Sequence, residues 1–270
     1  MSATSPKNLI KRWSRRVFAA GSRALSLGRP SAGNGVRILT YHRIAADDRD
    51  PFAVRPGDFV RQMETIARTS AVTGLDTALD GLKAGGASIP RVVVTFDDGT
   101  ADFIREAAPV LFRLGIPSVI YVNPSSLGEP GFLGWQDVQE LSRAGVEVGS
   151  HGMEHVSLGR LPPDEVRRQL LDSRRALEDR LGRDVRALAY PYGTMRDFNP
   201  RVMGEVSSAG YRSACTSING VNGPGSDPMA LRRTKVEQGD MRIFPWILDG
   251  ALDGWALIDT HLSFLQNRYV

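Results

Sequence analysis

The stretch "RVVVTFDDG", residues 91–99, joins an almost wholly apolar segment to two adjacent carboxylates and a glycine. A continuous apolar run predicts a strand that is buried on both faces, as in a parallel sheet. Asp97 and Asp98 follow the end of this strand, where two carboxylates are costly unless a cation or a catalytic task occupies them. A solvated Asp-Gly turn is the alternative, but the buried strand before it makes that alternative weaker.

Apolar runs of this kind alternate with helical patterns along the chain. The strand candidates are residues 36–42, 91–96, 118–122, 146–150, 187–190 and 211–216, and the helix candidates are about 57–69, 101–114, 135–144, 163–181 and 198–209. Alternation of strand and helix predicts a β/α barrel or a related wound sheet. The 270 residues, of which 41% are hydrophobic and 24% charged, suit one globular domain, placed at 36–270.

The single cysteine and the charge distribution limit the function further. Cys215 cannot form an intramolecular disulfide, and a small buried side chain is its expected role. The first 30 residues hold seven of the 34 basic residues and no acidic one, which leaves 27 basic against 30 acidic residues elsewhere. The body is therefore not expected to bind nucleic acid, and residues 1–35 are predicted to be a basic leader.

Three interpretations of this leader stay open. Apolar residues recur at spacings of three or four, which predicts a helix whose stripe can lie on an anionic membrane surface: Leu9, Trp13, Val17, Ala20, Ala24 and Leu27. The second interpretation is a partly disordered leader or a helix packed on the domain. The third is a twin-arginine export signal, which Arg23 and the lack of a clear cleavage site disfavour. We expect a cytoplasmic protein with optional peripheral contact to the inner membrane face.

Two of the four histidines lie in "SHGMEH", residues 150–155. The pattern from His151 to His155 matches H-x-x-E-H, a zinc motif of metallopeptidases in which Glu154 would be the base. That motif needs a long helix, whereas here a strand precedes His151 and Gly152 is a poor helix residue. We therefore expect two imidazoles that face one ion across a single helical turn, with Glu154 facing solvent.

Two further strand ends carry polar groups. "ALAYPYG", residues 187–193, ends in a loop whose backbone N–H groups could meet a developing oxyanion, and by itself it is an ordinary turn. His42 follows the first strand in "ILTYHRI" and is predicted to lie at the same sheet edge as the pair of aspartates, where it could transfer protons. His261 has no such setting and is expected on a surface helix.

Together these segments resemble the polysaccharide deacetylase family, also called the NodB-homology domain or carbohydrate esterase family 4. The resemblance rests on "TFDDG" (95–99), "SHGMEH" (150–155) and "YPYG" (190–193), and it covers roughly residues 36–250. It implies a deformed (β/α) barrel that holds one divalent metal ion, usually zinc. By this resemblance the ligands are Asp98, His151 and His155, the catalytic base is Asp97, and the N–H of Tyr192 stabilises the oxyanion.

The resemblance also implies a general acid, and the sequence departs from the family pattern at two positions. In a permuted subset that includes poly-N-acetylglucosamine deacetylases, the acid is a histidine of an early "YH" strand, and His42 fits that place. Gly152 replaces the usual Ser or Thr, which is expected to loosen the first metal histidine. Ala189 stands where the family has an arginine beside the base; Arg186 should face the opposite side, and Arg233 is a candidate substitute.

The resemblance leads to one main functional hypothesis and two alternatives. The main hypothesis is metal-dependent removal of N-acetyl groups from an N-acetylated glycan, such as a polysaccharide, a chitooligosaccharide or a lipid-linked precursor. The first alternative is deformylation or deacetylation of a lipid-linked sugar, which the basic leader would favour. The second is a non-catalytic glycan-binding protein, which would need neither Asp97 nor His42. Oligomeric state is not predicted.

Overall fold

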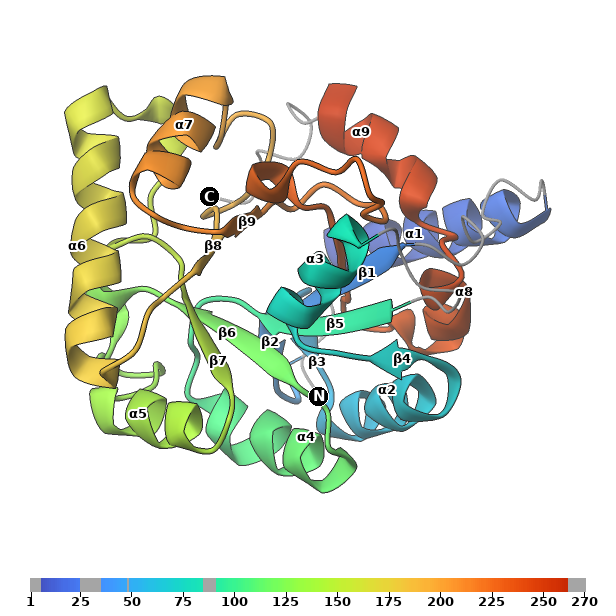
Figure 1. Cartoon of the computed structure of the whole chain (residues 1–270). Helices are drawn as coiled ribbons and strands as arrows, with labels where there is room; N and C mark the ends of the chain where they lie inside the picture. Colours follow the sequence, from blue (N-terminus) through green and yellow to red (C-terminus); the bar gives the residue numbers. More distant parts are fainter. Residues whose placement is uncertain (1–5, 25–34, 48, 85–90, 262–270) are drawn as a thin grey trace.

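The computed structural model describes residues 6–24, 35–47, 49–84 and 91–261. In these residues one parallel sheet of eight strands curls into a barrel, in the order β10-β1-β5-β6-β7-β8-β9, with β4 beside β5 (Figure 1). The strands are β1 (Val36–Tyr41), β4 (Ala71–Val72), β5 (Arg91–Phe96), β6 (Ser118–Val122), β7 (Glu147–Ser150), β8 (Ala187–Ala189), β9 (Ser213–Cys215) and β10 (Arg233–Lys235). The predicted deformed (β/α) barrel is confirmed.

The barrel is nearly closed between its first and last strands in the sheet order. No ladder joins β9 to β10 in the described chain; instead Cys215 and Leu231 form an isolated parallel bridge. Leu231 donates its N–H to the Ala214 carbonyl at 2.9 Å and accepts from the Thr216 N–H at 2.8 Å. The sheet therefore meets itself through one residue, which is the deformation of the barrel.

Both faces of the strands are buried, as their sequences predict. All six residues of β1 are buried, and alternate side chains point to the inside and the outside of the barrel. The inner set is a separate small core that continues onto α3 (Leu75–Lys83), and it contains Ile38, Val93, Tyr121, Ala189, Cys215, Leu79 and Leu82. Because these α3 side chains meet the first residues of β1 and β5, α3 covers the amino end of the barrel and leaves the carboxyl end for the site (Figure 1).

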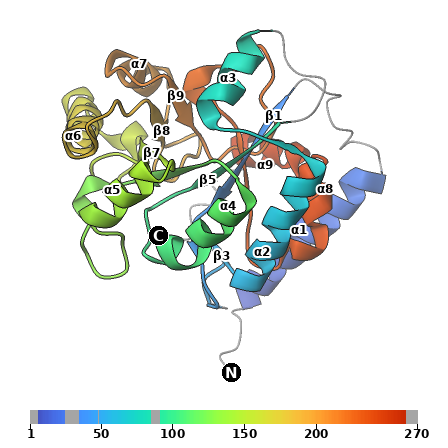
Figure 2. The same ribbon diagram turned by 60° about the horizontal axis from the view of Figure 1, so that its bottom comes forward.

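The outer faces of the strands pack against a ring of helices (Figure 2). The ring contains α2 (Pro56–Thr69), α4 (Ala108–Leu114), α5 (Trp135–Arg143), α6 (Pro163–Leu181), α7 (Pro200–Ser208) and α8 (Phe244–Leu248), and α9 (Ala256–His261) ends the described chain. Every predicted strand and helix of the domain is present within a few residues. The elements α3, β4, β10, α8 and α9 were not among the predictions.

One predicted helix has an irregular start. Residues 101–114 were expected to form one α-helix, but Phe103–Ala107 form a π-helical turn, η1, before α4 begins at Ala108. Pro109 has no N–H to donate to Arg105 four residues earlier, so a regular α-helical bond is missing at this point. This wider turn begins a few residues after Asp97 and Asp98 in the chain.

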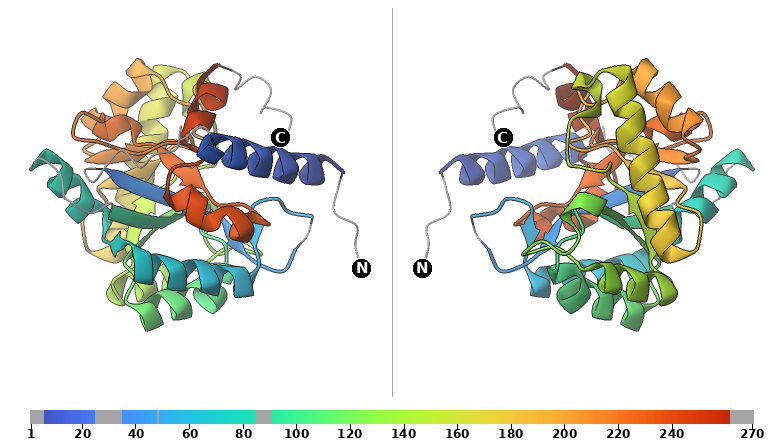
Figure 3. Two further views of the ribbon diagram at one scale, coloured as in Figure 1. Left: turned by 90° about the vertical axis from the view of Figure 1, so that its right-hand side faces the viewer. Right: turned by 90° about the vertical axis from the view of Figure 1, so that its left-hand side faces the viewer.

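The leader forms a helix, α1 (Pro6–Ala24), that packs along the domain beside α8 and the short turn η5 (Asp240–Ile243) (Figure 3). Leu27 and most of the Gly/Ser-rich segment at 31–35 lie outside the described residues. No described helix is long and apolar enough to cross a membrane. The boundary between leader and domain at residue 35 stays a prediction.

Candidate functional site

The carboxyl ends of four strands, together with the first residue of β10, bring the candidate residues together. His42 follows β1, Asp97 and Asp98 follow β5, and His151 follows β7. The loop after β8 carries Tyr192, and β10 carries Arg233. The strand ends therefore converge as predicted, and β10 adds Arg233 to the group.

Asp98, His151 and His155 form the one cluster of metal-ligating side chains in the described residues. Their ligand atoms lie within 4.8 Å of one another. Asp98 Oδ1 is 3.5 Å from His151 Nε2 and 3.6 Å from His155 Nε2. Two imidazole nitrogens and one carboxylate oxygen are a set that suits a zinc ion with one coordination position left open.

The orientation of His151 is fixed by the neighbouring strand. Its ring is buried, and Nδ1 lies 2.7 Å from the carbonyl oxygen of Ala189. Since a carbonyl only accepts, Nδ1 carries the proton and Nε2 is free to face an ion. β8 therefore holds the ring directly, and the expected loosening of this histidine by Gly152 stays a prediction.

The histidine pair faces one point without a helical turn. Met153, Glu154 and His155 form a bend, and Gly152 has φ of +79°, a value at which a side chain is strained. A Cβ at Gly152 would also lie 3.1 Å from the carbonyl oxygen of Glu154. The predicted helical turn is wrong, and the glycine is what allows the chain to reverse here.

Backbone strain is concentrated at the site. Asp98 (φ +72°) and Tyr192 (φ +61°) are the two non-glycine residues with positive φ in the described chain, and both belong to the candidate site. Tyr192 is the central residue of a three-residue turn closed by Gly193 N–H to the Pro191 carbonyl at 2.7 Å. Such conformations cost of order 1–3 kcal/mol each and persist where surrounding packing enforces them.

The carboxylate of Asp97 is paired with Arg233 and does not belong to the metal-ligating cluster. Both side chains are buried, and Nη1–Oδ1 and Nη2–Oδ2 are each 2.7 Å. Arg233 Nε also donates to the Thr216 carbonyl at 2.8 Å. The missing arginine at position 189 is thus replaced by Arg233 from β10, while Arg186 faces away and pairs with Asp184 at 2.9 Å.

These contacts set the protonation of the carboxylates. Burial opposes ionisation of Asp97, but Arg233 and His151 hold its pKa below the usual value. Burial likewise opposes ionisation of Asp98, yet His151 and the nearby His42 hold its pKa far below the usual range. Burial, with a smaller contribution from the neighbouring His151, lowers the pKa of His155 to about 4. Both carboxylates are therefore ionised at neutral pH, and His155 is a neutral ligand.

His42 lies close enough to lower the pKa of Asp97 and Asp98. Within the described part of the chain its Nδ1 is buried without a hydrogen-bond partner, and its ring lies 5.0 Å from that of Phe52. A buried polar atom without a partner is unusual and costly, which makes this nitrogen a functional candidate. His261, in contrast, is exposed on α9, as predicted.

Several supporting residues were missed by the sequence analysis. Asn123, directly after β6, donates from Nδ2 to the His151 carbonyl and, at 3.3 Å, to that of Gly152. Gln169 on α6 accepts from the Glu154 N–H at 2.9 Å and donates to its carboxylate at 2.7 Å. A polar residue directly after the apolar run "SVIYV" was the available signal for Asn123, whereas nothing local marks Gln169.

Residues 84–214 match the polysaccharide deacetylase family. A Bacillus subtilis protein named as a polysaccharide deacetylase, YxkH, is 26% identical over 204 residues. The match covers 75% of this chain and 71% of that protein. IcaB from Ammonifex degensii superimposes with a TM-score of 0.71 and 25% identity, covering 82% of this chain and 98% of that one. The chain contains a polysaccharide deacetylase domain.

The deacetylase domain has a shorter match to a third protein. The peptidoglycan-N-acetylglucosamine deacetylase PgdA of Listeria monocytogenes is 28% identical over 117 residues, or 43% of this chain and 24% of that one. His42 and Arg233 both lie outside the family match at 84–214, yet the barrel brings them to the site. As a deacetylase, the protein is a hydrolase, and the metallopeptidase interpretation of "SHGMEH" is not supported; Glu154 is exposed, as expected.

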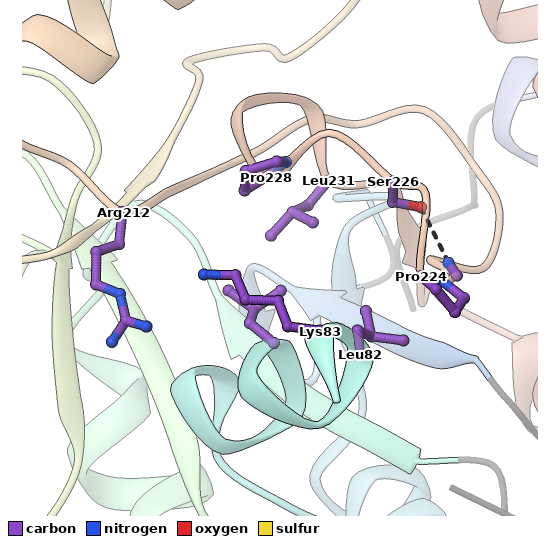
Figure 4. Close-up of a pocket in the computed structure, with 9 residues that line it drawn as sticks. Leu82, Lys83, Arg212, Pro224, Ser226, Pro228 and Leu231 are labelled. Atoms are coloured by element: carbon purple, nitrogen blue, oxygen red, sulfur yellow. Dashed lines mark hydrogen bonds between the residues drawn. The ribbon is translucent and has the colours of Figure 1, made fainter. Parts of the chain in front are cut away.

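Two cavities of the deacetylase lie at opposite ends of the barrel. One, of about 50 Å³, lies between α3 and the loop before β10 and is lined by Leu82, Lys83, Arg212 and Leu231 among others (Figure 4). Its lining residues precede β9 and β10, so this cavity is at the amino end, away from the site. The other, of about 420 Å³, is lined by residues that follow His42 and Asp98: Arg43, Ile44, Ala45, Ala46, Pro56, Ala101, Asp102, Arg105, Glu106 and Gly131.

Cys215 is buried in the barrel, as expected. Burial raises the pKa of its thiol, and Tyr121 Oη lies 3.4 Å from its sulfur. A buried thiol with a raised pKa is a poor nucleophile, so Cys215 has a packing role in the inner core.

Proposed function

We propose that the deacetylase removes N-acetyl groups from N-acetylamino sugars of a glycan and that it depends on one divalent ion, zinc, held by Asp98, His151 and His155. The observation that carries this proposal is the three-residue cluster with ligand atoms within 4.8 Å, next to a separate buried carboxylate. The unprotonated Nε2 of His151 and the ionised carboxylate of Asp98 are suitable ligands for a zinc ion. When bound, such an ion polarises the acetyl carbonyl and acidifies water.

The remaining steps fall to side chains and backbone of this chain. Asp97 accepts the proton of the attacking water, because Arg233 keeps it ionised and fixes both of its oxygens. The N–H of Tyr192 donates to the carbonyl oxygen as negative charge develops on it. His42 donates a proton to the departing sugar nitrogen, which leaves as a free amine, and the acetyl carbon leaves as acetate. In this role His42 corresponds to the acid of the permuted subset.

Two observations favour a sugar polymer as the substrate. PgdA, which is similar over 117 residues, is named for deacetylation of peptidoglycan N-acetylglucosamine. The cavity of about 420 Å³ beside the site offers charged groups of both signs, from Arg43, Asp102, Arg105 and Glu106. Ligand pockets of a few hundred Å³ hold a small molecule, and a hydroxyl-rich sugar ring next to the reacting unit matches this lining.

The function is tested by measuring acetate and free amine from N-acetylglucosamine oligomers, with and without a chelator. We expect both products in equal amounts, loss of both with chelator and recovery with zinc. His151→Ala and His155→Ala should lose metal and activity, with His261→Ala as the matched control. Glycan binding without product release would favour the non-catalytic alternative.

The cavity is tested with substrates of increasing length. Arg105→Ala and Glu106→Gln should raise KM for long oligomers several-fold with little change in kcat, and should leave the shortest substrate unaffected. Arg113→Ala, an exposed arginine on α4, is the control. Equal effects on all lengths would show that the cavity holds no neighbouring sugar.

A lipid-linked glycan precursor is a second candidate substrate. The outward face of α1 favours it, because Trp13 and Val17 are 68% and 48% exposed on the surface of the protein. A comparison of soluble and lipid-linked N-acetylated or N-formylated sugars separates the two candidates through kcat/KM.

A further inference from the structure

Helix α1 attaches to the barrel through charge rather than through its apolar stripe. Arg15 is buried, with Nη2 2.7 Å from Asp240 Oδ2 and 2.9 Å from the Lys235 carbonyl, and Nη1 3.7 Å from Glu237. Arg16 Nη2 donates to the Gly239 carbonyl at 3.0 Å. A buried arginine with several partners fixes both the rotation and the position of the helix.

Small and aromatic residues complete this inner face. Ala19 is fully buried, and the ring of Phe18 meets that of Trp255 edge-on at 5.0 Å. α1 runs along α8 on the outside of the barrel, with its opposite side facing away from the protein (Figure 3). The helix therefore has one defined face toward the domain and one toward the surroundings.

The outward face carries the apolar stripe. Trp13 and Val17 are 68% and 48% exposed, and Ala20 and Ala24 are also exposed. Their spacings of four, three and four place all of them on one side of the helix. A surface helix ordinarily buries its apolar stripe and exposes its charges, and α1 does the reverse at Arg15 and Trp13.

Charge indicates what covers this stripe. Residues 1–30 contain seven basic residues and no acidic one, and two of the seven, Arg15 and Arg16, bind the domain rather than an outside partner. Arg23, 58% exposed at the end of the stripe, lies over the ring of Trp246 at 5.4 Å and 3.8 Å from Asp249, which is also exposed. Tryptophan favours the boundary between lipid and water, and a polybasic segment is attracted to anionic head groups.

We propose that the outward face of α1, defined by Trp13, Val17, Ala20 and Ala24, docks the protein on an anionic lipid surface, with the barrel held rigidly behind it by Arg15. The helix lies in the plane of the membrane surface and inserts Trp13 and Val17 at the level of the head groups. This inference does not depend on the proposed catalytic roles, because its test measures binding alone.

The test is sedimentation of the full chain with vesicles of phosphatidylcholine containing about a third phosphatidylglycerol. The protein should pellet with these vesicles at low salt, and pelleting should fall with pure phosphatidylcholine and at high salt. The double variant Trp13→Ser with Val17→Ser should weaken binding at least tenfold. Phe112→Ser, which changes a 48% exposed residue on α4, is the matched control and should bind as the wild type does.

Circular dichroism and the melting temperature show whether each variant is folded. No pelleting of the wild type at low salt, or equal loss in the Phe112→Ser variant, overturns the proposal. A wild-type dimer that Trp13→Ser dissociates, without vesicle binding, would assign the face to a second copy of the chain and also overturn it. A third variant, Trp13→Phe, keeps an aromatic ring and should retain most of the binding.

Discussion

Arg233 holds both oxygens of Asp97 through two hydrogen bonds of 2.7 Å, and neither side chain has appreciable contact with solvent. The two residues are 136 positions apart and come from neither neighbouring strands nor a common loop. This pair separates the roles of the two adjacent aspartates: Asp97 is tied to a fixed cation, and Asp98 is left to face the imidazoles.

Removal of the arginine should therefore affect both stability and turnover. Arg233→Met leaves a buried carboxylate unpaired and should lower the free energy of unfolding by about 3–5 kcal/mol. Arg233→Lys keeps the charge but not the two parallel bonds, and should lower kcat at least tenfold with metal content unchanged. Urea unfolding, metal analysis and initial rates measure these effects.

The neighbouring arginine provides the control for that experiment. Arg232 is exposed, so Arg232→Lys should change neither quantity. The double variant Arg233→Met with Asp97→Asn should regain part of the lost stability, because both buried charges are gone. Full activity and stability in Arg233→Lys would show that the pair has no positioning role.

His42 provides a second prediction, on the final proton transfer. His42→Ala should keep its metal and its melting temperature but lose on the order of 10²–10⁴ in rate, the usual contribution of general acid–base catalysis. The loss should be smaller for an ester substrate, because an alkoxide needs protonation less than an amine does. His261→Ala is the control, and an essential His261 with a dispensable His42 would refute this assignment.

Glu147, at the start of β7, predicts a pH dependence of stability. Burial, reinforced by Asp76, raises the pKa of its carboxyl from 4.5 to about 7. The folded protein thus holds this proton more tightly than the unfolded chain, so the contribution of Glu147 is present below about pH 4.5 and is lost as the pH rises through about 7.

Glu147→Gln should remove this loss. At pH 8 the variant should be more stable than the wild type by about 1–3 kcal/mol, with little difference at pH 4.5. Urea unfolding at several pH values measures the difference, and Glu129→Gln, an exposed change, should follow the wild-type curve. A variant with unchanged pH dependence would contradict the role of Glu147.

The barrel and most of the site could be predicted from the sequence because their signals are local. Apolar runs that end in Asp97, His151 and the "YPYG" loop identify strands and the polar groups after them. Tertiary structure then brings these strand ends together by the general geometry of parallel β/α units. For the same reason the ligand cluster followed from the sequence, although its backbone conformation at Gly152 did not.

Elements without a local signal were missed. β10 reads "RTK", with two charged residues of three, and Arg233 can be buried there because it pairs with Asp97, which directly follows β5. That pairing is a long-range contact, which periodicity cannot report. α3 was missed for a different reason: Leu75, Ala78, Leu79 and Leu82 do have helical spacing, but the segment is short and follows a two-residue strand.

The leader shows a third kind of difference. The stripe of apolar residues on α1 was visible in the sequence, and such a stripe ordinarily packs on a domain. The orientation of the helix depends instead on the ion pairs of Arg15 with Asp240 and Glu237, more than 200 residues later. Which face of α1 points outward could therefore not be derived from its own residues.

The most direct test of the central claim is zinc content and deacetylation rate measured together in Asp97→Asn and Asp98→Asn. Asp97→Asn should keep about one zinc per chain and lose turnover, because an amide cannot accept the proton of water. Asp98→Asn should lose both zinc and turnover, because one of three ligands is replaced. If Asp97→Asn loses the metal while Asp98→Asn keeps it, the two carboxylates have the opposite roles and the account of the site is wrong.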